Sequence, residues 1–74
     1  MSILPMMAAR TVIQKLIRAD FTYVGTRGSH YYFKHYLKGL ITSVPKHGGK
    51  DIGRGLLAQI IKQAGLTIKE FLDL

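Results

Sequence analysis

Apolar side chains recur with the period of a helix near the start of the chain. One face of this segment carries Val12, Ile13, Leu16 and Ile17. Because this spacing follows the 3.6-residue repeat, we expect an amphipathic helix from about residue 8 to residue 19. Residues 1–7 are apolar but form only a short stretch, and we expect a loosely ordered arm there.

The middle of the chain changes to the pattern of strands. Residues 21–27 are rich in β-branched and aromatic side chains and predict a strand, which Gly28 ends with a turn. Residues 29–37 predict a second strand with two faces. The more apolar face, expected toward the core, carries Ser29, Tyr31, Phe33, His35 and Leu37, and the other carries His30, Tyr32, Lys34 and Tyr36. A third strand over residues 40–45 ends at a proline.

The helical pattern returns in the last third. A second helix is expected to end at Ala64, because Gly65 is a suitable C-terminal stop. Thr67 and Glu70 have the spacing of a capping box, which predicts a short final turn that buries Phe71.

The order of these elements predicts the fold class. Strands grouped between helices, in the order α-β-β-β-α, are typical of an α+β fold. We expect a three-stranded antiparallel sheet with both helices on one face. At 74 residues the chain is expected to form a single domain, residues 1–74.

The charge of the chain is strongly positive and unevenly spread. There are 11 Lys and Arg against 4 Asp and Glu, a formal net charge of +7. Eight of the cations and a single acid lie in residues 1–50, whereas residues 51–74 are balanced. This asymmetry favours contact with a polyanion or an acidic partner over a merely soluble basic surface.

Other patterns narrow the function classes. The chain has no cysteine, which fits the reducing cytoplasm where we expect it to act. No apolar run approaches the ~20 residues of a membrane span, and the apolar start lacks the basic region of a signal peptide. Histidines at positions 30, 35 and 47 fit no standard ligand set, so we expect no metal and no cofactor. Residues 47–50 (HGGK) lack the spacing of a Walker motif.

His30 is the main candidate for chemistry. An unperturbed imidazole titrates at about pH 6.5 and exchanges protons at cellular pH. From the residues alone, His30 is either such an acid–base group or an ordinary strand residue.

Other side chains are candidates for binding. Four cations are candidate phosphate contacts, each with a solvated surface charge as the alternative: Arg27, Lys34, Lys46 and Lys50. Tyr32 and Tyr36 either stack on unpaired bases or pack across the strands. Ser29 and His47 are auxiliary candidates, His47 for proton transfer or phosphate binding.

Four segments carry a family likeness. They are residues 12–21 (VIQKLIRADF), 27–30 (RGSH), 44–50 (VPKHGGK) and 55–71 (GLLAQIIKQAGLTIKEF). In this order and at these spacings, the chain resembles HicA, the toxin of a prokaryotic type II toxin–antitoxin pair. The sequence departs from the family at Asp20, where a glycine is common, at residues 54–56 (RGL in place of GTL), and in its dense aromatics after His30.

The resemblance implies a fold, an activity and a partner. Family members have a fold similar to the double-stranded-RNA-binding domain and act as ribosome-independent mRNA interferases. It implies that His30 is catalytic and that a HicB antitoxin covers its face, in a complex that can also repress its own gene. The alternative is a non-catalytic module that binds double-stranded RNA through its charge alone.

Overall fold

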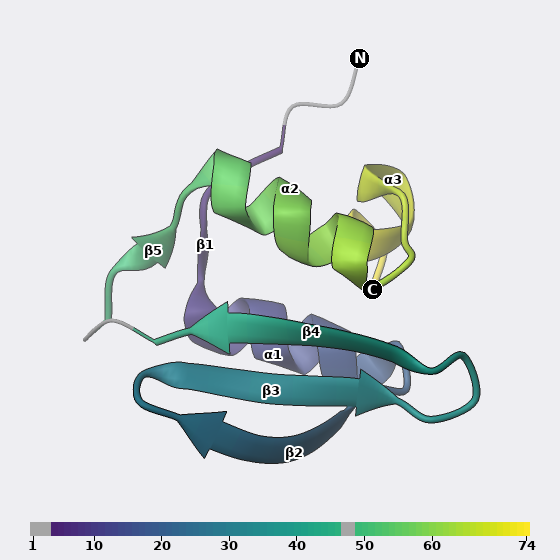
Figure 1. Ribbon diagram of the computed structural model, residues 1–74. Coiled ribbons are helices and arrows are strands. Elements are labelled where there is room, and N and C mark those ends of the chain that lie inside the picture. The colour runs from purple at the N-terminus through teal and green to yellow at the C-terminus, as the bar shows by residue number, and fades with distance from the viewer. Residues whose placement is uncertain (1–3, 47–48) are drawn as a thin grey trace.

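The computed structural model describes residues 4–46 and 49–74 (Figure 1). Its elements are β1 Met7–Ala8, α1 Ala9–Arg18, β2 Thr22–Arg27, β3 His30–His35, β4 Leu40–Pro45, β5 Asp51–Ile52, α2 Arg54–Gln63 and α3 Ile68–Leu72. The predicted α-β-β-β-α order is confirmed. The short strands β1 and β5 were not predicted.

The main sheet is antiparallel, in the order β2-β3-β4. Helix α1 lies behind this sheet and α2 runs along β4 (Figure 1). Thr42 on β4 ties the sheet to α2, because its hydroxyl lies 3.0 Å from Oε1 of Gln63 and 3.5 Å from the carbonyl oxygen of Ile60. Both helices bury their apolar faces on the same side of the sheet, which confirms the predicted α+β architecture.

The two faces of β3 are as predicted over its central residues. Phe33 and His35 are buried, together with Val44 on β4. The strand ends at His35, however, so Leu37 lies in the following turn and is 94% exposed instead of facing the core. Ser29 is likewise exposed, because it belongs to the turn before β3.

His35 is packed inside the fold and has a structural role. Its Nδ1 accepts a hydrogen bond from the backbone N–H of Lys38 at 3.2 Å, and its ring meets Phe21 edge-on at 5.4 Å. It is therefore a core histidine that shapes the β3–β4 turn.

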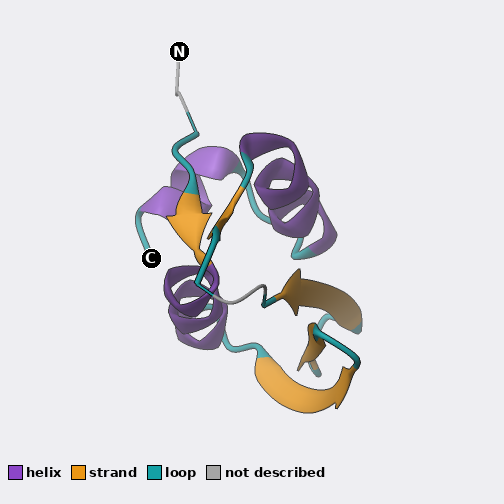
Figure 2. Cartoon of the chain, turned by 90° about the vertical axis from the view of Figure 1, so that its left-hand side faces the viewer, coloured by secondary structure: helices purple, strands orange, loops and turns teal. Residues whose placement is uncertain are grey.

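The segment expected to be a loose arm is packed where the structure describes it. Leu4 is buried in the core, and β1 pairs antiparallel with β5, matching Met7 with Ile52 and Ala8 with Asp51. Residues 1–3 lie outside the described part of the chain. Figure 2, which looks onto this end of the molecule, shows the small ladder between the helices.

The helix ends follow local sequence rules with one exception. The Thr67–Glu70 capping box is formed and Phe71 is fully buried, as predicted. Gly65 follows α2 with φ +72°, the left-handed conformation that glycine adopts without strain. Asp20, just after α1, has φ +70° although it is not a glycine. In the described part of the chain, no helix is long and apolar enough to cross a membrane.

Candidate functional site

His30 is the first residue of β3 and its side chain is exposed. It pairs with Arg27 on β2 and with Pro45 on β4. Directly opposed residues on antiparallel strands point to the same side, with Cβ atoms about 4.5–5.5 Å apart. The sheet register therefore makes the Arg27 and His30 side chains neighbours on the open face of the sheet.

A backbone hydrogen bond fixes the turn in front of His30. The N–H of Lys46, just after β4, donates to the carbonyl oxygen of Ser29 at 2.8 Å. The exposed Lys46 Nζ lies 5.7 Å from the ring centroid of Tyr31. The backbones of Ser29 and Lys46, which the sequence singled out separately, thus meet next to His30, whereas the Lys46 side chain lies by Tyr31 on the opposite face of the sheet.

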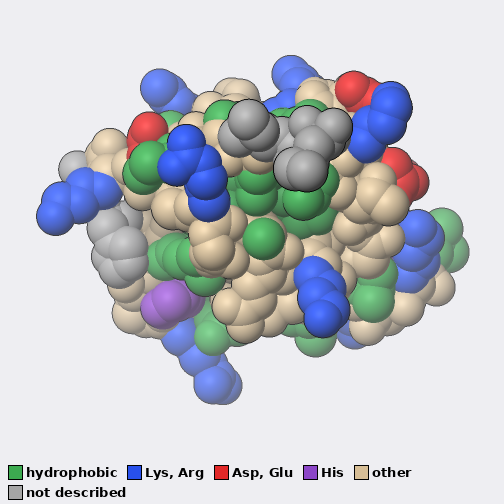
Figure 3. Space-filling model, turned by 90° about the horizontal axis from the view of Figure 1, so that it is seen from above, with side chains coloured by type: hydrophobic (Ala, Val, Ile, Leu, Met, Phe, Trp, Pro, Cys, Tyr) green, Lys and Arg blue, Asp and Glu red, His purple; other side chains and the backbone are tan. Residues whose placement is uncertain are grey.

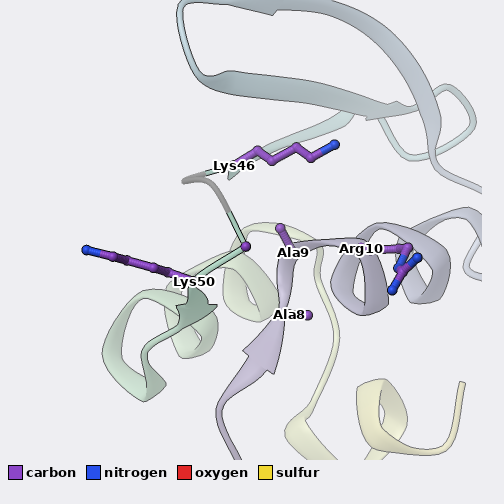
Figure 4. A pocket seen from close by; sticks show the side chains of 6 residues that line it. Ala8, Ala9, Arg10, Lys46 and Lys50 are labelled. Carbon is purple, nitrogen blue, oxygen red and sulfur yellow. The ribbon is translucent and has the colours of Figure 1, made fainter.

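A hollow of about 300 Å³ opens at the same end of the molecule. It is lined by Ala8, Ala9, Arg10, Lys46, Gly49 and Lys50. Figure 4 shows that the Lys46 and Lys50 side chains extend in opposite directions from its rim. The hollow brings together segments that are far apart in sequence, because the β1–β5 ladder holds the start of α1 against the segment after β4.

Arg10 is a functional candidate that the sequence did not reveal. It lies in the first turn of α1, where Ala8 at the N-cap supplies no side-chain hydrogen bond and no acidic residue occurs. The first N–H groups of a helix carry a partial positive charge, which adds to that of Arg10. No local motif marks this position, since only the pairing of β1 with β5 brings it to the site.

The cations at this end have no acidic partner among the residues that the structure places. Within residues 4–46 and 49–74, the one ion pair joins Lys69 and Asp73 at 2.8 Å. Lys15 is engaged elsewhere, because its Nζ donates to the carbonyl oxygens of Leu72 and Leu74. The acidic residue closest in sequence to the hollow is Asp51, which is exposed on β5. Positive charge therefore predominates at this end of the described structure.

Two groups on α3 have shifted pKa values, Lys69 and Glu70. The hydrogen bond and the charge of Asp73 raise the pKa of Lys69. Hydrogen bonds from the backbone and side chain of Thr67 lower the pKa of Glu70. The Glu70 shift arises from the capping box at the start of α3, and the Lys69 shift arises from its i,i+4 ion pair with Asp73.

A second hollow, of about 330 Å³, lies on the outer face of the sheet. Its lining is Val24, Gly25, Thr26, Arg27, Tyr32 and Ile41. The register of β2 against β3 shifts between Tyr23 and Gly25, which is a β-bulge. Tyr32 is the next residue after His30 on this face of β3, and Arg27 lies opposite His30 on β2. Because both Tyr32 and Arg27 line the hollow, it adjoins His30.

Two of the predicted residues are not placed at this site. Lys34 lies on the outer face, but four residues along β3 put it about 13 Å from His30, and its Nζ sits 5.0 Å from the Tyr36 ring centroid. His47 lies outside the described residues. Among the residues that are described, no cluster of three or more His, Cys, Asp or Glu forms a possible metal site.

The arrangement combines proton transfer with anion binding. An exposed imidazole and the Arg27 guanidinium share the outer face of the sheet, and Lys46 and Lys50 lie at the same end of the molecule without an acidic partner among the described residues. In the space-filling view, a histidine side chain reaches the surface next to a Lys or Arg side chain (Figure 3). Such a surface attracts polyanions and can move a proton at a bound phosphate group.

Two comparisons with known proteins both find similarity to HicA toxins. The family model described as the HicA toxin of bacterial toxin-antitoxin matches residues 9–66. The chain is also 50% identical over 40 residues to a protein named "Probable mRNA interferase HicA" from Pseudomonas fluorescens (strain Pf0-1). That alignment covers 54% of this chain and 63% of the relative, so it spans less than two thirds of the relative's length.

Proposed function

Because the chain belongs to the HicA toxin family, we propose that it is the toxin of a toxin–antitoxin pair and an endoribonuclease that cleaves mRNA in the cytoplasm. The relative's name, an mRNA interferase, supports this activity. The excess of positive charge at the His30 end supports a polyanionic substrate.

His30 is the general acid–base group of the proposed reaction. Its neutral imidazole takes the proton of an RNA 2′-hydroxyl, and the 2′-oxygen attacks the adjacent phosphorus. The bond from phosphorus to the 5′-oxygen breaks, and water gives that leaving oxygen its proton. The products are a 2′,3′-cyclic phosphate and a free 5′-hydroxyl, and the imidazolium then returns its proton to solvent.

The cations near His30 stabilise the charge that develops. Arg27, its cross-strand partner, offers a planar fork of N–H donors to the non-bridging phosphate oxygens. Lys46 and Lys50 hold the flanking phosphates, and Arg10 joins them from the start of α1. Preorganised charges of this kind act where negative charge increases in the transition state. The proton transfers of this proposed reaction are complete without a metal ion.

The observation that carries the proposal is the register of the sheet. It sets His30 at the exposed start of β3, opposite Arg27 and beside the turn that Lys46 anchors. A histidine with only a packing role has a different environment in this chain, as His35 shows by its burial and its hydrogen bond to the next turn.

The test compares the wild type with His30→Ala and His30→Gln on a long single-stranded RNA in EDTA. We expect cleavage by the wild type only, with cyclic phosphate ends on the fragments. Matched circular dichroism and melting curves control for folding, since His30 is exposed. Undiminished cleavage by both variants would remove His30 from the mechanism, and loss of wild-type cleavage in EDTA would remove its metal independence.

We further propose that a HicB-like antitoxin covers the His30 face, in a complex that can grow into a larger toxin–antitoxin assembly. The support is the family together with the exposure of His30 and Arg27, which leaves this face accessible to a partner. Reversing the charge with Arg27→Glu is expected to weaken the complex, measured by calorimetry, whereas Lys62→Glu on α2 is the control. Equal affinity of both variants would place the antitoxin elsewhere.

A non-catalytic module that binds double-stranded RNA is the second candidate. It is favoured by the cations that have no acidic partner within residues 4–46 and 49–74, since such cations alone suffice for salt-sensitive binding. It predicts that duplex RNA stays intact with the wild type and that His30→Ala leaves its affinity unchanged.

A further inference from the structure

We propose that the hollow on the outer face of the sheet seats one unpaired nucleobase beside His30, so that the toxin selects the nucleotide next to the cleaved phosphate. This inference rests on the proposed ribonuclease function. It assigns a role to the β-bulge in β2, which the reaction itself does not use.

The bulge creates the space for a base. Gly25 has φ +148°, and a Cβ atom built on it would meet no other atom within 4 Å. At the register shift, β2 places Gly25, which has no side chain, directly opposite Tyr32 in the middle of the hollow. The hydroxyls of Tyr23 and Thr26 hydrogen-bond to each other across the bulge and hold its shape.

Tyr32 offers the stacking surface. It lies directly opposite Gly25, so the cross-strand position that faces it on β2 has no side chain. Val24 and Ile41, which are 45% and 55% exposed, flank it as apolar walls at the surface. Apolar walls, one aromatic ring and one guanidinium, from Arg27, fit a flat aromatic group that is joined to a phosphate.

The size and position of the hollow fit a single nucleotide. A volume of about 330 Å³ lies at the lower end of small-molecule sites. Tyr32 is two residues along β3 from His30, about 7 Å on the same face. A nucleotide stacked on Tyr32 therefore presents one of its two phosphates to His30 and Arg27.

The lining also indicates the kind of selectivity. It contains no carboxylate and no side-chain amide, its guanidinium (Arg27) is assigned to the phosphate, and the Thr26 hydroxyl is hydrogen-bonded to Tyr23. Selection thus comes from stacking and shape, which discriminates ring size more than base identity.

The experiment is a double-mutant cycle between Tyr32 and the RNA. All proteins carry His30→Ala to keep the RNA intact, and affinity is measured by fluorescence anisotropy. The RNAs are one short single strand and a set in which each nucleotide in turn is abasic. Tyr32→Leu keeps apolar bulk without a ring, Tyr32→Phe keeps the ring, and Tyr36→Leu is the control outside the hollow.

We expect one abasic position to weaken binding about tenfold in the parent, in Tyr32→Phe and in Tyr36→Leu, but not in Tyr32→Leu. The same loss at every position, or a loss that Tyr32→Leu leaves unchanged, would overturn the inference. Failure of the ribonuclease proposal is separate, because it appears as intact RNA with the wild type, whereas the cycle reports on binding alone.

Discussion

The salt dependence of RNA binding tests whether the cations around His30 act as phosphate contacts. Each phosphate neutralised on a single strand contributes about 0.7 to the slope of log affinity against log salt concentration. Four cations at this end have no acidic partner among the described residues: Arg10, Arg27, Lys46 and Lys50. If all four contact phosphates, they account for a slope of about −2.8.

Replacing one of these cations with glutamine is expected to make the slope shallower by about 0.7 and to weaken binding similarly for all sequences. Lys62→Gln is the matched control, because Lys62 is exposed on α2 and lines neither hollow. The assay is fluorescence anisotropy with single-stranded RNA at several salt concentrations, in the His30→Ala background. A slope that Lys46→Gln leaves unchanged, or one that Lys62→Gln reduces equally, would refute the assignment of contacts.

Three further predictions concern stability. Asp20→Gly is expected to stabilise the fold by up to about 1 kcal/mol in thermal melts, because it relieves φ +70° at a non-glycine residue. Gly65→Ala is expected to destabilise it by about 1–2 kcal/mol or more in urea titrations, since an L-residue is strained there and its Cβ would lie 2.8 Å from Leu40 Cδ1. The pKa of Glu70 is lowered from 4.5 by the Thr67 hydrogen bonds, so its contribution to stability is present above that value and is lost as pH falls through the folded pKa. Glu70→Gln should therefore flatten the acid side of the melting-temperature profile, and an unchanged profile would contradict this account.

The parts of the fold that depend on local signals were predictable from sequence. The capping box at Thr67 and the glycine stop at residue 65 need only neighbouring residues, and both are confirmed. The period-two pattern of β3 correctly predicted that Phe33 is buried in the core. It was wrong for Leu37, because alternation does not reveal where a strand ends.

The parts that depend on distant pairing were not predictable. Two-residue strands such as β1 and β5 leave no periodicity to detect, so the packing of Leu4 and the position of Arg10 stayed hidden. The bulge in β2 is marked in the sequence only by a single glycine, Gly25, which is equally compatible with a regular strand or a turn. His30 and Arg27 could be singled out because one motif contains both.

The β1–β5 ladder has a consequence for when the proposed site is completed during synthesis. Met7 pairs with Ile52, so the hollow that adjoins Arg10 and Lys46 cannot close before residue 52 has left the ribosome. Contacts between residues so far apart form late in folding, because the intervening loop must first be closed. A growing chain thus contains the turn before His30 well before all of the proposed phosphate contacts are in place, so the proposed site is incomplete until late in synthesis.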